Sequence, residues 1–185
     1  MEMKLEKGRP LDFDDRLPKE KKCYELLDSL EIEYYRCDHR ENGANTMEDC
    51  LKIDSILEAA VCKNLFLCNR QHTQFYLLMM PGDKVFKTKE LSGQLGCARL
   101  SFAEPEYMLK YLDITPGSVS VLGLMNDTDN AVSLIVDEDI LTQEYVGVHP
   151  CINTTSLKIK ISDIFGKLTE AMHHEMTKVK LVGEE

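Results

Sequence analysis

The sequence predicts a single domain of mixed α/β or α+β class, with several hairpins and peripheral helices. Its length of 185 residues suits one domain with one sizeable core. Segments with the 3.6-residue period of an amphipathic helix are interspersed with short runs of β-branched and aromatic residues. No internal repeat, linker or low-complexity segment divides the chain.

The first predicted element of the domain is a helix over about 18–30. Pro18 can occupy its first turn, and four apolar residues recur at helical spacing: Cys23, Leu26, Leu27 and Leu30. An alternating strand over 32–37 follows. The preceding segment, 1–17, is polar and has little periodicity. We therefore predict an N-terminal arm, mobile or loosely docked, ahead of a domain over 18–185.

A capping box and a hairpin are predicted next. Thr46 with Asp49 has the form of the capping box, although Glu or Gln is usual at the second position. A helix over about 47–59 should follow. Two apolar runs, 60–68 and 74–80, are joined by five polar residues, which indicates two strands of a hairpin.

The second half of the chain should alternate short helices and strands. Short helices are predicted over 89–95 and 104–112, and apolar strands over 118–124 and 131–136. The last helix has the clearest pattern, with apolar residues at i, i+3, i+4, i+7 and i+11: Ile161, Ile164, Phe165, Leu168 and Met172.

Charge and cysteine content exclude several classes of protein. The net charge of −10 argues against a protein that coats nucleic acid non-specifically, but it leaves room for a local basic groove. No apolar run approaches 18 residues, and the N-terminus has no signal-like core, so we expect no membrane association. Seven cysteines without a CxxC pair indicate reduced thiols in the cytoplasm. Neither Cys nor His occurs at zinc-ligand spacing, and no metal or cofactor is expected.

The segment 147–155 is the strongest local candidate for a functional site. It places His149 on a backbone stiffened by Pro150, between Gly147 and the small polar side chains of Asn153 and Thr154. Such a loop could hold a small polar substrate or a water, with the imidazole as a proton carrier. The alternative is a hydrogen-bonded loop histidine beside a turn that satisfies its own backbone.

Lys63 begins an otherwise apolar strand. It is either an edge lysine with its head in water, or a cation at the lip of a pocket that meets a phosphate, a carboxylate or a developing oxyanion. Gly117 and Ser118 could form a backbone nest for a carboxylate or oxyanion, and the alternative is a plain turn. Asn126 is a candidate ligand of the same kind, but it also fits a turn.

Four motifs, in order and spacing, resemble those of the YbaK/ProX family, the free-standing relatives of the prolyl-tRNA synthetase editing domain. Each motif is weak alone, and the four together are specific. They are KNLFL at 63–67; LSFA and PE at 100–103 and 105–106; TPGSV, GL and ND at 115–119, 123–124 and 126–127; and HP and NT at 149–150 and 153–154.

This resemblance covers about 20–180 and implies a fold and an activity. The fold would be one mixed α/β domain around a central, mixed, barrel-like β-sheet with peripheral helices. The activity would be trans-editing: hydrolysis of the ester between a wrong amino acid and its tRNA. The ProX branch, which this chain resembles most, implies Ala-tRNA(Pro). Deacylation of Cys-tRNA(Pro) or another small aminoacyl group is an alternative. A non-catalytic module that binds tRNA or a synthetase is another.

The resemblance also implies roles for single residues. Lys63 matches the essential lysine of the family, and His149 matches the histidine that lines the aminoacyl pocket. Four further matches would contact or support the substrate: Gly117, Ser118, Asn153 and Thr154. Gly147 and Asn126 complete the predicted substrate-binding set. The partner would be the acceptor end of a mischarged tRNA, with prolyl-tRNA synthetase as a further candidate.

A net negative chain needs local positive charge to hold that tRNA. Four basic residues cluster around one predicted hairpin and helix, and we predict that they contact the acceptor-stem phosphates. The alternative is an ordinary solvated basic face. These residues are Lys84, Lys87, Lys89 and Arg99.

Overall fold

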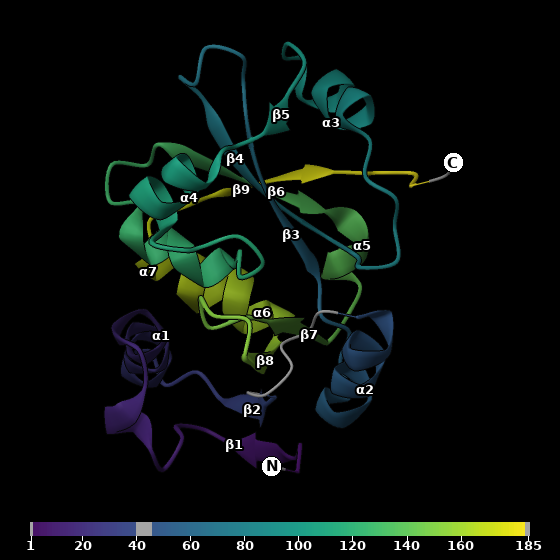
Figure 1. Cartoon of the computed structure of the whole chain (residues 1–185). Helices are drawn as coiled ribbons and strands as arrows, with labels where there is room; N and C mark the ends of the chain where they lie inside the picture. Colours follow the sequence, from purple (N-terminus) through teal and green to yellow (C-terminus); the bar gives the residue numbers. More distant parts are fainter. Residues whose placement is uncertain (1, 40–45, 184–185) are drawn as a thin grey trace.

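The computed structural model describes residues 2–39 and 46–183 and contains two β-sheets in one mixed α/β domain (Figure 1). Sheet A, in the lower half of Figure 1, has the order β1-β2-β8-β7. Its strands are β1 (Leu5–Lys7), β2 (Tyr34–Asp38), β8 (Thr155–Lys160) and β7 (Tyr145–Val148), and every pairing is antiparallel.

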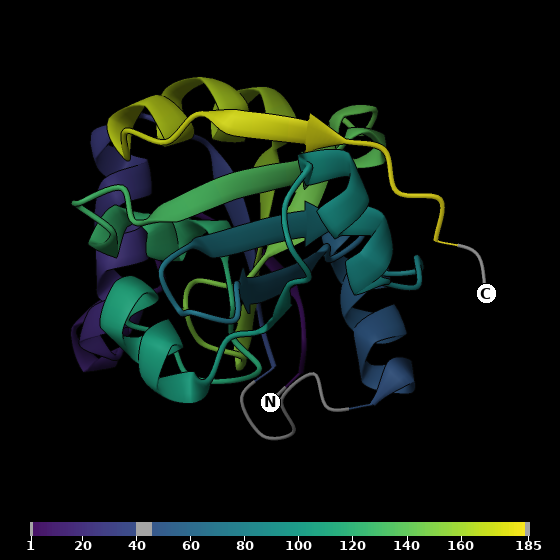
Figure 2. The same cartoon turned by 90° about the horizontal axis from the view of Figure 1, so that it is seen from above.

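Sheet B, in the upper half of Figure 1, has the order β5-β3-β4-β6-β9. Its strands are β5 (Ser101–Phe102), β3 (Lys63–Cys68), β4 (Phe75–Met80), β6 (Val132–Asp137) and β9 (Met176–Val179). The predicted β3–β4 hairpin is confirmed, whereas β4–β6 and β6–β9 are parallel pairs reached by crossovers. Figure 2 shows four of these strands in their order across the sheet, from yellow β9 through green β6 to blue β4 and β3.

A single parallel bridge joins the two sheets and produces the barrel-like closure. Val61 lies opposite Gly147, with Cys62 N–H donating to Gly147 O at 3.0 Å and Gly147 N–H donating to Ala60 O at 2.9 Å. A Cβ at Gly147 would lie 2.7 Å from Val61 Cγ2. Because no real Cβ makes so short a contact, the closure requires glycine at this position.

The helices lie where the sequence predicted them, except for the short α5 (Glu138–Leu141), where a break was expected. The predicted ones include α1 (Pro18–Ser29), α2 (Met47–Leu57), α3 (Thr88–Leu95) and α4 (Pro105–Leu112). The last helix comprises α6 (Ile161–Asp163), a π-helical stretch η3 (Ile164–Leu168) and α7 (Thr169–Ala171). The capping box of Thr46 and Asp49 is present at the start of α2. Among the described residues, no helix has both the length and the apolar character that crossing a membrane requires.

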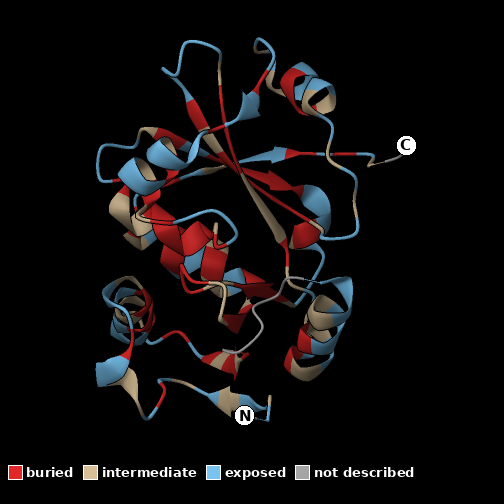
Figure 3. Ribbon diagram, in the orientation of Figure 1, coloured by how far each residue is buried: buried red, intermediate tan, exposed pale blue. Residues whose placement is uncertain are grey.

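Most buried residues lie in the central strands and in the helical segments packed on them (Figure 3). The largest apolar cluster includes Phe66 of β3 and Leu77 of β4. A second cluster, which includes Leu67 of β3, packs sheet B against Leu91 of α3. Because side chains alternate along a strand, Lys63 shares the α3-facing side of β3 with Leu67.

The expectation of a mobile or loosely docked N-terminal arm is wrong. A short 3-10 helix, η1 (Phe13–Asp15), follows β1, and β1 extends sheet A by pairing with β2. Arg16 is buried and pairs with Glu20 of α1 at 2.8 Å and with Asp38 of β2 at 2.9 Å. Asp38 is 22 residues from Arg16, so local polarity gave no sign of the docking.

The predicted strand over 118–124 is also wrong, because the segment contains a 3-10 helix, η2 (Val121–Asn126). Ser120 caps it, with Oγ accepting from Leu122 N at 3.2 Å. A Cβ at Gly123 would lie 2.6 Å from Ile114 Cδ1, so the helix packs closely against the end of α4. Its first four residues are all buried, and a short run buried on every side does not distinguish strand from helix.

Candidate active site

The bridge between the sheets lies just ahead of the two main predicted residues. Val61 and Gly147 are paired in parallel, so the two segments that contain them run in the same direction. Lys63 and His149 each follow two residues later, at the first residue of β3 and just beyond the end of β7. The bridge thus places a candidate cation and a candidate base at equivalent positions, each two residues beyond a paired residue.

Lys63 carries a positive charge without a neutralising partner. Its Nζ donates to the backbone carbonyl of Lys84 at 2.6 Å, and the side chain is partly buried. No carboxylate lies within ion-pair distance of it in 2–39 or 46–183. An ammonium has three donors, so two remain for a phosphate or a developing oxyanion.

His149 is held in one tautomer by the start of β8. Its Nδ1 lies 3.1 Å from the carbonyl of Thr155, which can only accept, so Nδ1 bears the proton. In the neutral ring Nε2 therefore keeps its lone pair. Removal of the ring from water lowers the pKa of His149, and the bond to Thr155 opposes this effect without cancelling it. At neutral pH the group is a base and an acceptor.

A second histidine, His39, belongs to the same corner and was not predicted as a site residue. Its backbone N–H donates to Thr154 O at 2.9 Å, and its Nε2 lies 3.0 Å from Ser156 Oγ. Burial, reinforced by the proximity of His149, lowers the pKa of His39 to about 4. Ser156 is 117 residues away in sequence, so no local pattern could have identified this pairing.

The two predicted loops meet, and two of their backbone groups bind within the protein. Gly117, at φ +90°, lies with its Cβ position 3.8 Å from Asn153 Nδ2. The amide of Ser118 donates to Thr115 O at 3.2 Å, as in a plain turn, so it does not form the anion-binding nest considered from sequence. Thr154 contributes the carbonyl that holds His39.

Two residues of the predicted substrate-binding set have structural roles instead. Gly147 uses its N–H and its C=O in the bridge that joins the sheets. Asn126 donates from Nδ2 to Leu112 O at 2.8 Å, which satisfies a carbonyl at the end of α4. Both residue types are typical of tight turns and helix ends, which is why sequence alone could not separate the two roles.

The predicted basic surface is divided by the structure. Lys87 and Lys89 are exposed at the start of α3, and Arg99 is exposed beyond its end. Lys84 is instead bound by protein groups, with its Nζ 2.8 Å from both Asp137 and Asp139. A phosphate contact by Lys84 would require breaking these ion pairs, so its predicted role on the tRNA surface is not supported by the geometry.

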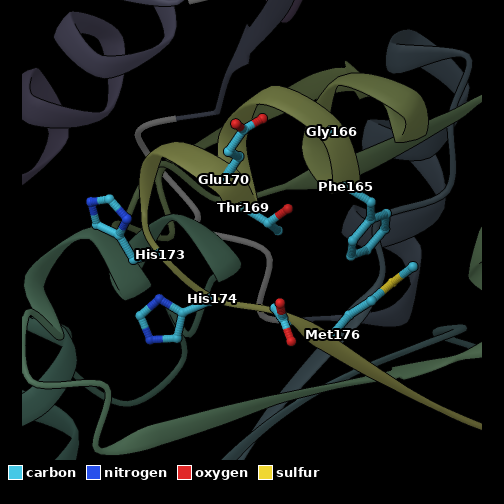
Figure 4. A pocket seen from close by; sticks show the side chains of 8 residues that line it. Phe165, Gly166, Thr169, Glu170, His173, His174 and Met176 are labelled. Atoms are coloured by element: carbon cyan, nitrogen blue, oxygen red, sulfur yellow. The ribbon is translucent and has the colours of Figure 1, made fainter.

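A surface pocket lies elsewhere, along η3, α7 and the start of β9 (Figure 4). None of the predicted site residues lines it. Its wall includes His174, whose Nε2 lies 2.9 Å from Asp127, a bond that ties the C-terminal crossover to the turn after η2. The eight lining residues are Phe165, Gly166, Thr169, Glu170, His173, His174, Glu175 and Met176.

The sequence matches the model of the aminoacyl-tRNA editing domain over residues 41–166, which is more than half of the chain. The chain belongs to this family. Its membership confirms the family resemblance read from the four motifs and identifies an aminoacyl-tRNA editing protein, as the sequence predicted. The match spans the start of β3 and the end of β7, and therefore both Lys63 and His149.

Relatives of this editing protein include two curated sequences. The "Prolyl-tRNA editing protein ProX" of Acetoanaerobium sticklandii is 33% identical over 138 residues, which cover 75% of this chain and 83% of the relative. The "Prolyl-tRNA synthetase associated domain-containing protein 1" of Danio rerio is 30% identical over 155 residues, which cover 83% of each.

Solved structures with low identity share the editing-domain fold. A structure titled as a candidate trans-editing enzyme for prolyl tRNA synthetase aligns with a TM-score of 0.65 at 13% identity. The alignment covers 90% of this chain and 99% of that one. It therefore extends beyond the residues of the family match and confirms the predicted single mixed α/β domain.

Proposed function

We propose that this protein is a trans-editing deacylase that hydrolyses the aminoacyl ester of mischarged tRNA(Pro), with alanine as the preferred amino acid. The placement of Lys63 and His149, each two residues beyond the paired Val61 and Gly147, carries this proposal. The names of the relatives from Acetoanaerobium sticklandii and Danio rerio point to prolyl-tRNA as the substrate and to prolyl-tRNA synthetase as a functional partner.

The chemistry needs an attacking oxygen and stabilisation of charge. Water adds to the ester carbonyl carbon, the bond to the terminal ribose oxygen breaks, and that oxygen takes up a proton to leave as a hydroxyl. Lys63 stabilises the charge on the carbonyl oxygen or anchors the terminal phosphate. His149 Nε2 accepts the proton of the attacking water, or the neighbouring ribose hydroxyl accepts it while passing its own proton to the leaving ribose oxygen.

Cysteine chemistry is disfavoured at this site. Cys62 precedes Lys63 but is buried, and burial raises the pKa of its thiol to about 12. Cys151 follows His149-Pro150 and is also buried. Because the thiolate is the nucleophilic form, attack by water is the better reading.

The need for such an enzyme follows from the limits of binding. A pocket that accepts proline cannot strongly exclude a smaller side chain, because a missing methylene is worth only about 1–3 kcal/mol. A second site of smaller size then removes the error. Lys87, Lys89 and Arg99 are the residues we propose for acceptor-stem phosphates, which predicts weak and salt-dependent tRNA binding.

The direct test is deacylation of purified Ala-tRNA(Pro), Cys-tRNA(Pro) and Pro-tRNA(Pro) under single-turnover conditions. We expect rapid loss of alanine, slower loss of cysteine, and loss of proline at the uncatalysed rate. Preferential hydrolysis of the cysteinyl ester would correct the amino acid. Hydrolysis of none of the three would contradict the proposal and favour a non-catalytic binding module.

The rate should depend on pH through His149. Because burial lowers its pKa, the ring stays neutral below its ordinary value of about 6.5, and kcat/KM should fall only at still lower pH. His149→Ala should lower the rate and remove this acid limb. Corrections for uncatalysed ester hydrolysis, and circular dichroism at each pH, accompany the measurement. An acid limb centred above pH 6.5, or one retained in His149→Ala, would contradict the assignment.

A further inference from the structure

Lys84 connects three segments of the chain near the start of β3. Its Nζ lies 2.8 Å from Asp137 Oδ2 at the end of β6, 2.8 Å from Asp139 Oδ2 in α5, and 2.7 Å from the carbonyl of Leu181 in the C-terminal segment. The Lys84 side chain is 15% exposed and that of Asp137 is fully buried. These three partners fix the position of the Lys84 ammonium, whereas the ammonium of a surface lysine is free to move.

The buried partner makes this ion pair necessary. Asp137 also accepts from Asp139 N–H at 3.1 Å through Oδ1, so its carboxylate is fixed by α5 on one side and by Lys84 on the other. Burial alone would lower the pKa of Lys84, but the bonds to Asp137 and Asp139 outweigh it and raise the pKa. Removal of the lysine would leave a buried carboxylate without its cation, which is strongly unfavourable.

The main chain of the same residue holds Lys63. The Lys84 carbonyl accepts from Lys63 Nζ at 2.6 Å. The turn that carries this carbonyl is closely fitted to the start of β3: Lys84 N–H donates to Pro81 O at 3.3 Å, and a Cβ at Gly82 would lie 3.0 Å from Val61 O. The side chain of Lys84 therefore anchors one end of a turn whose carbonyl fixes the Lys63 ammonium.

We propose that Lys84 is a positioning residue for Lys63: its ion pair with Asp137 holds the carbonyl that orients the Lys63 ammonium toward the ester. This inference rests on the proposed deacylase function. It assigns to Lys84 a role different from the phosphate contact expected from sequence. It also gives a reason for the contrast between the two lysines: Lys84 has three protein partners, whereas Lys63 has no carboxylate partner among the described residues.

The test uses Lys84→Met, which removes the ion pair, and Lys84→Arg, which keeps a cation beside Asp137. Lys178→Met on exposed β9 is the matched control. Misplacement of a catalytic group by about 1 Å can cost up to about 10²-fold, so we expect kcat of Lys84→Met to fall by about ten- to 10²-fold. KM for charged tRNA and the salt dependence should not change, and Lys84→Arg should recover most of the rate.

Two outcomes would overturn the proposal. If KM rises and the salt dependence weakens while kcat is unchanged, Lys84 binds RNA phosphate, as Lys87→Glu is expected to show. If the melting temperature falls but kcat per folded molecule at low temperature equals that of the wild type, Lys84 serves stability alone.

A second readout does not depend on turnover. The ¹⁵N ammonium resonance of Lys63, assigned by its loss in Lys63→Ala, should be visible in the wild type, shift or vanish in Lys84→Met, and persist in Lys84→Arg. An unchanged resonance in folded Lys84→Met would overturn the positioning role. If the wild type hydrolyses no charged tRNA, the proposed function fails by itself, and the resonance still decides whether Lys84 orients Lys63.

Discussion

Replacement of Lys63 by alanine is expected to lower kcat/KM for deacylation by about 10²–10³-fold, the usual cost of removing a group that stabilises a developing oxyanion. The fold should survive. The side chain is only partly buried and makes one hydrogen bond, to the Lys84 carbonyl, which water can replace. The change in unfolding free energy should be about 1 kcal/mol or less. Single-turnover deacylation and urea unfolding measure the two effects separately.

A matched variant distinguishes loss of this particular cation from loss of positive charge in general. Lys178→Ala removes one charge from exposed β9 and should leave the rate unchanged. Lys63→Arg should recover only part of the activity, because a planar guanidinium does not place its donors where an ammonium does. A rate for Lys63→Ala within about threefold of wild type would show that Lys63 has no part in the mechanism. Another group would then have to stabilise the oxyanion.

The sequence predicted those elements whose signal is local. The capping box of Thr46 and Asp49 and the proline at the start of α1 are visible in a few residues, and both helices begin there. The strand β9 was missed because it is an edge strand with mostly exposed residues, which shows no alternation. The 3-10 helix at Val121–Asn126 was mistaken for a strand because its first four residues are all buried.

In the site, too, the residues recognised from sequence lie in local motifs, and the contacts that were missed join residues distant in sequence. Lys63 and His149 were proposed from sequence because each lies within a recognisable motif. The partner of Lys84 at Asp137 is 53 residues away, so the sequence showed only a lysine near other basic residues. His39 was missed because its partners lie on β8, which pairs with β2 through the fold alone.

The N-terminal segment matters to the site through one buried cluster. Arg16 contacts Asp38, and Asp38 accepts from Thr155 Oγ1 at 2.8 Å. The carbonyl of the same Thr155 holds His149. Burial disfavours ionisation of Asp38, but bonds from Arg16, Thr155 and Arg36 outweigh it and hold the pKa of Asp38 well below its ordinary value. The segment expected to be an arm therefore supports the residue proposed as the base.

Arg16→Met should consequently be the most destabilising of the substitutions considered. It leaves the carboxylates of Glu20, 2% exposed, and Asp38, 8% exposed, without their main cation. Breaking a buried pair in this way costs about 3–5 kcal/mol, which a shift of the urea midpoint would report. Lys4→Met, which removes an ion pair of 67% and 37% exposed side chains in the same segment, should cost less than about 1 kcal/mol.

The pH dependence separates this explanation from simple loss of packing. A carboxylate with a depressed pKa contributes stability above its unfolded pKa of about 3.9, and this contribution is lost as the pH falls through the folded value. The difference in stability between wild type and Arg16→Met should therefore be full at pH 7 and shrink toward pH 3. A difference of the same size at both pH values would mean that Arg16 acts by filling space and not by charge. A difference below about 1 kcal/mol at pH 7 would show that the segment is docked by β1 alone.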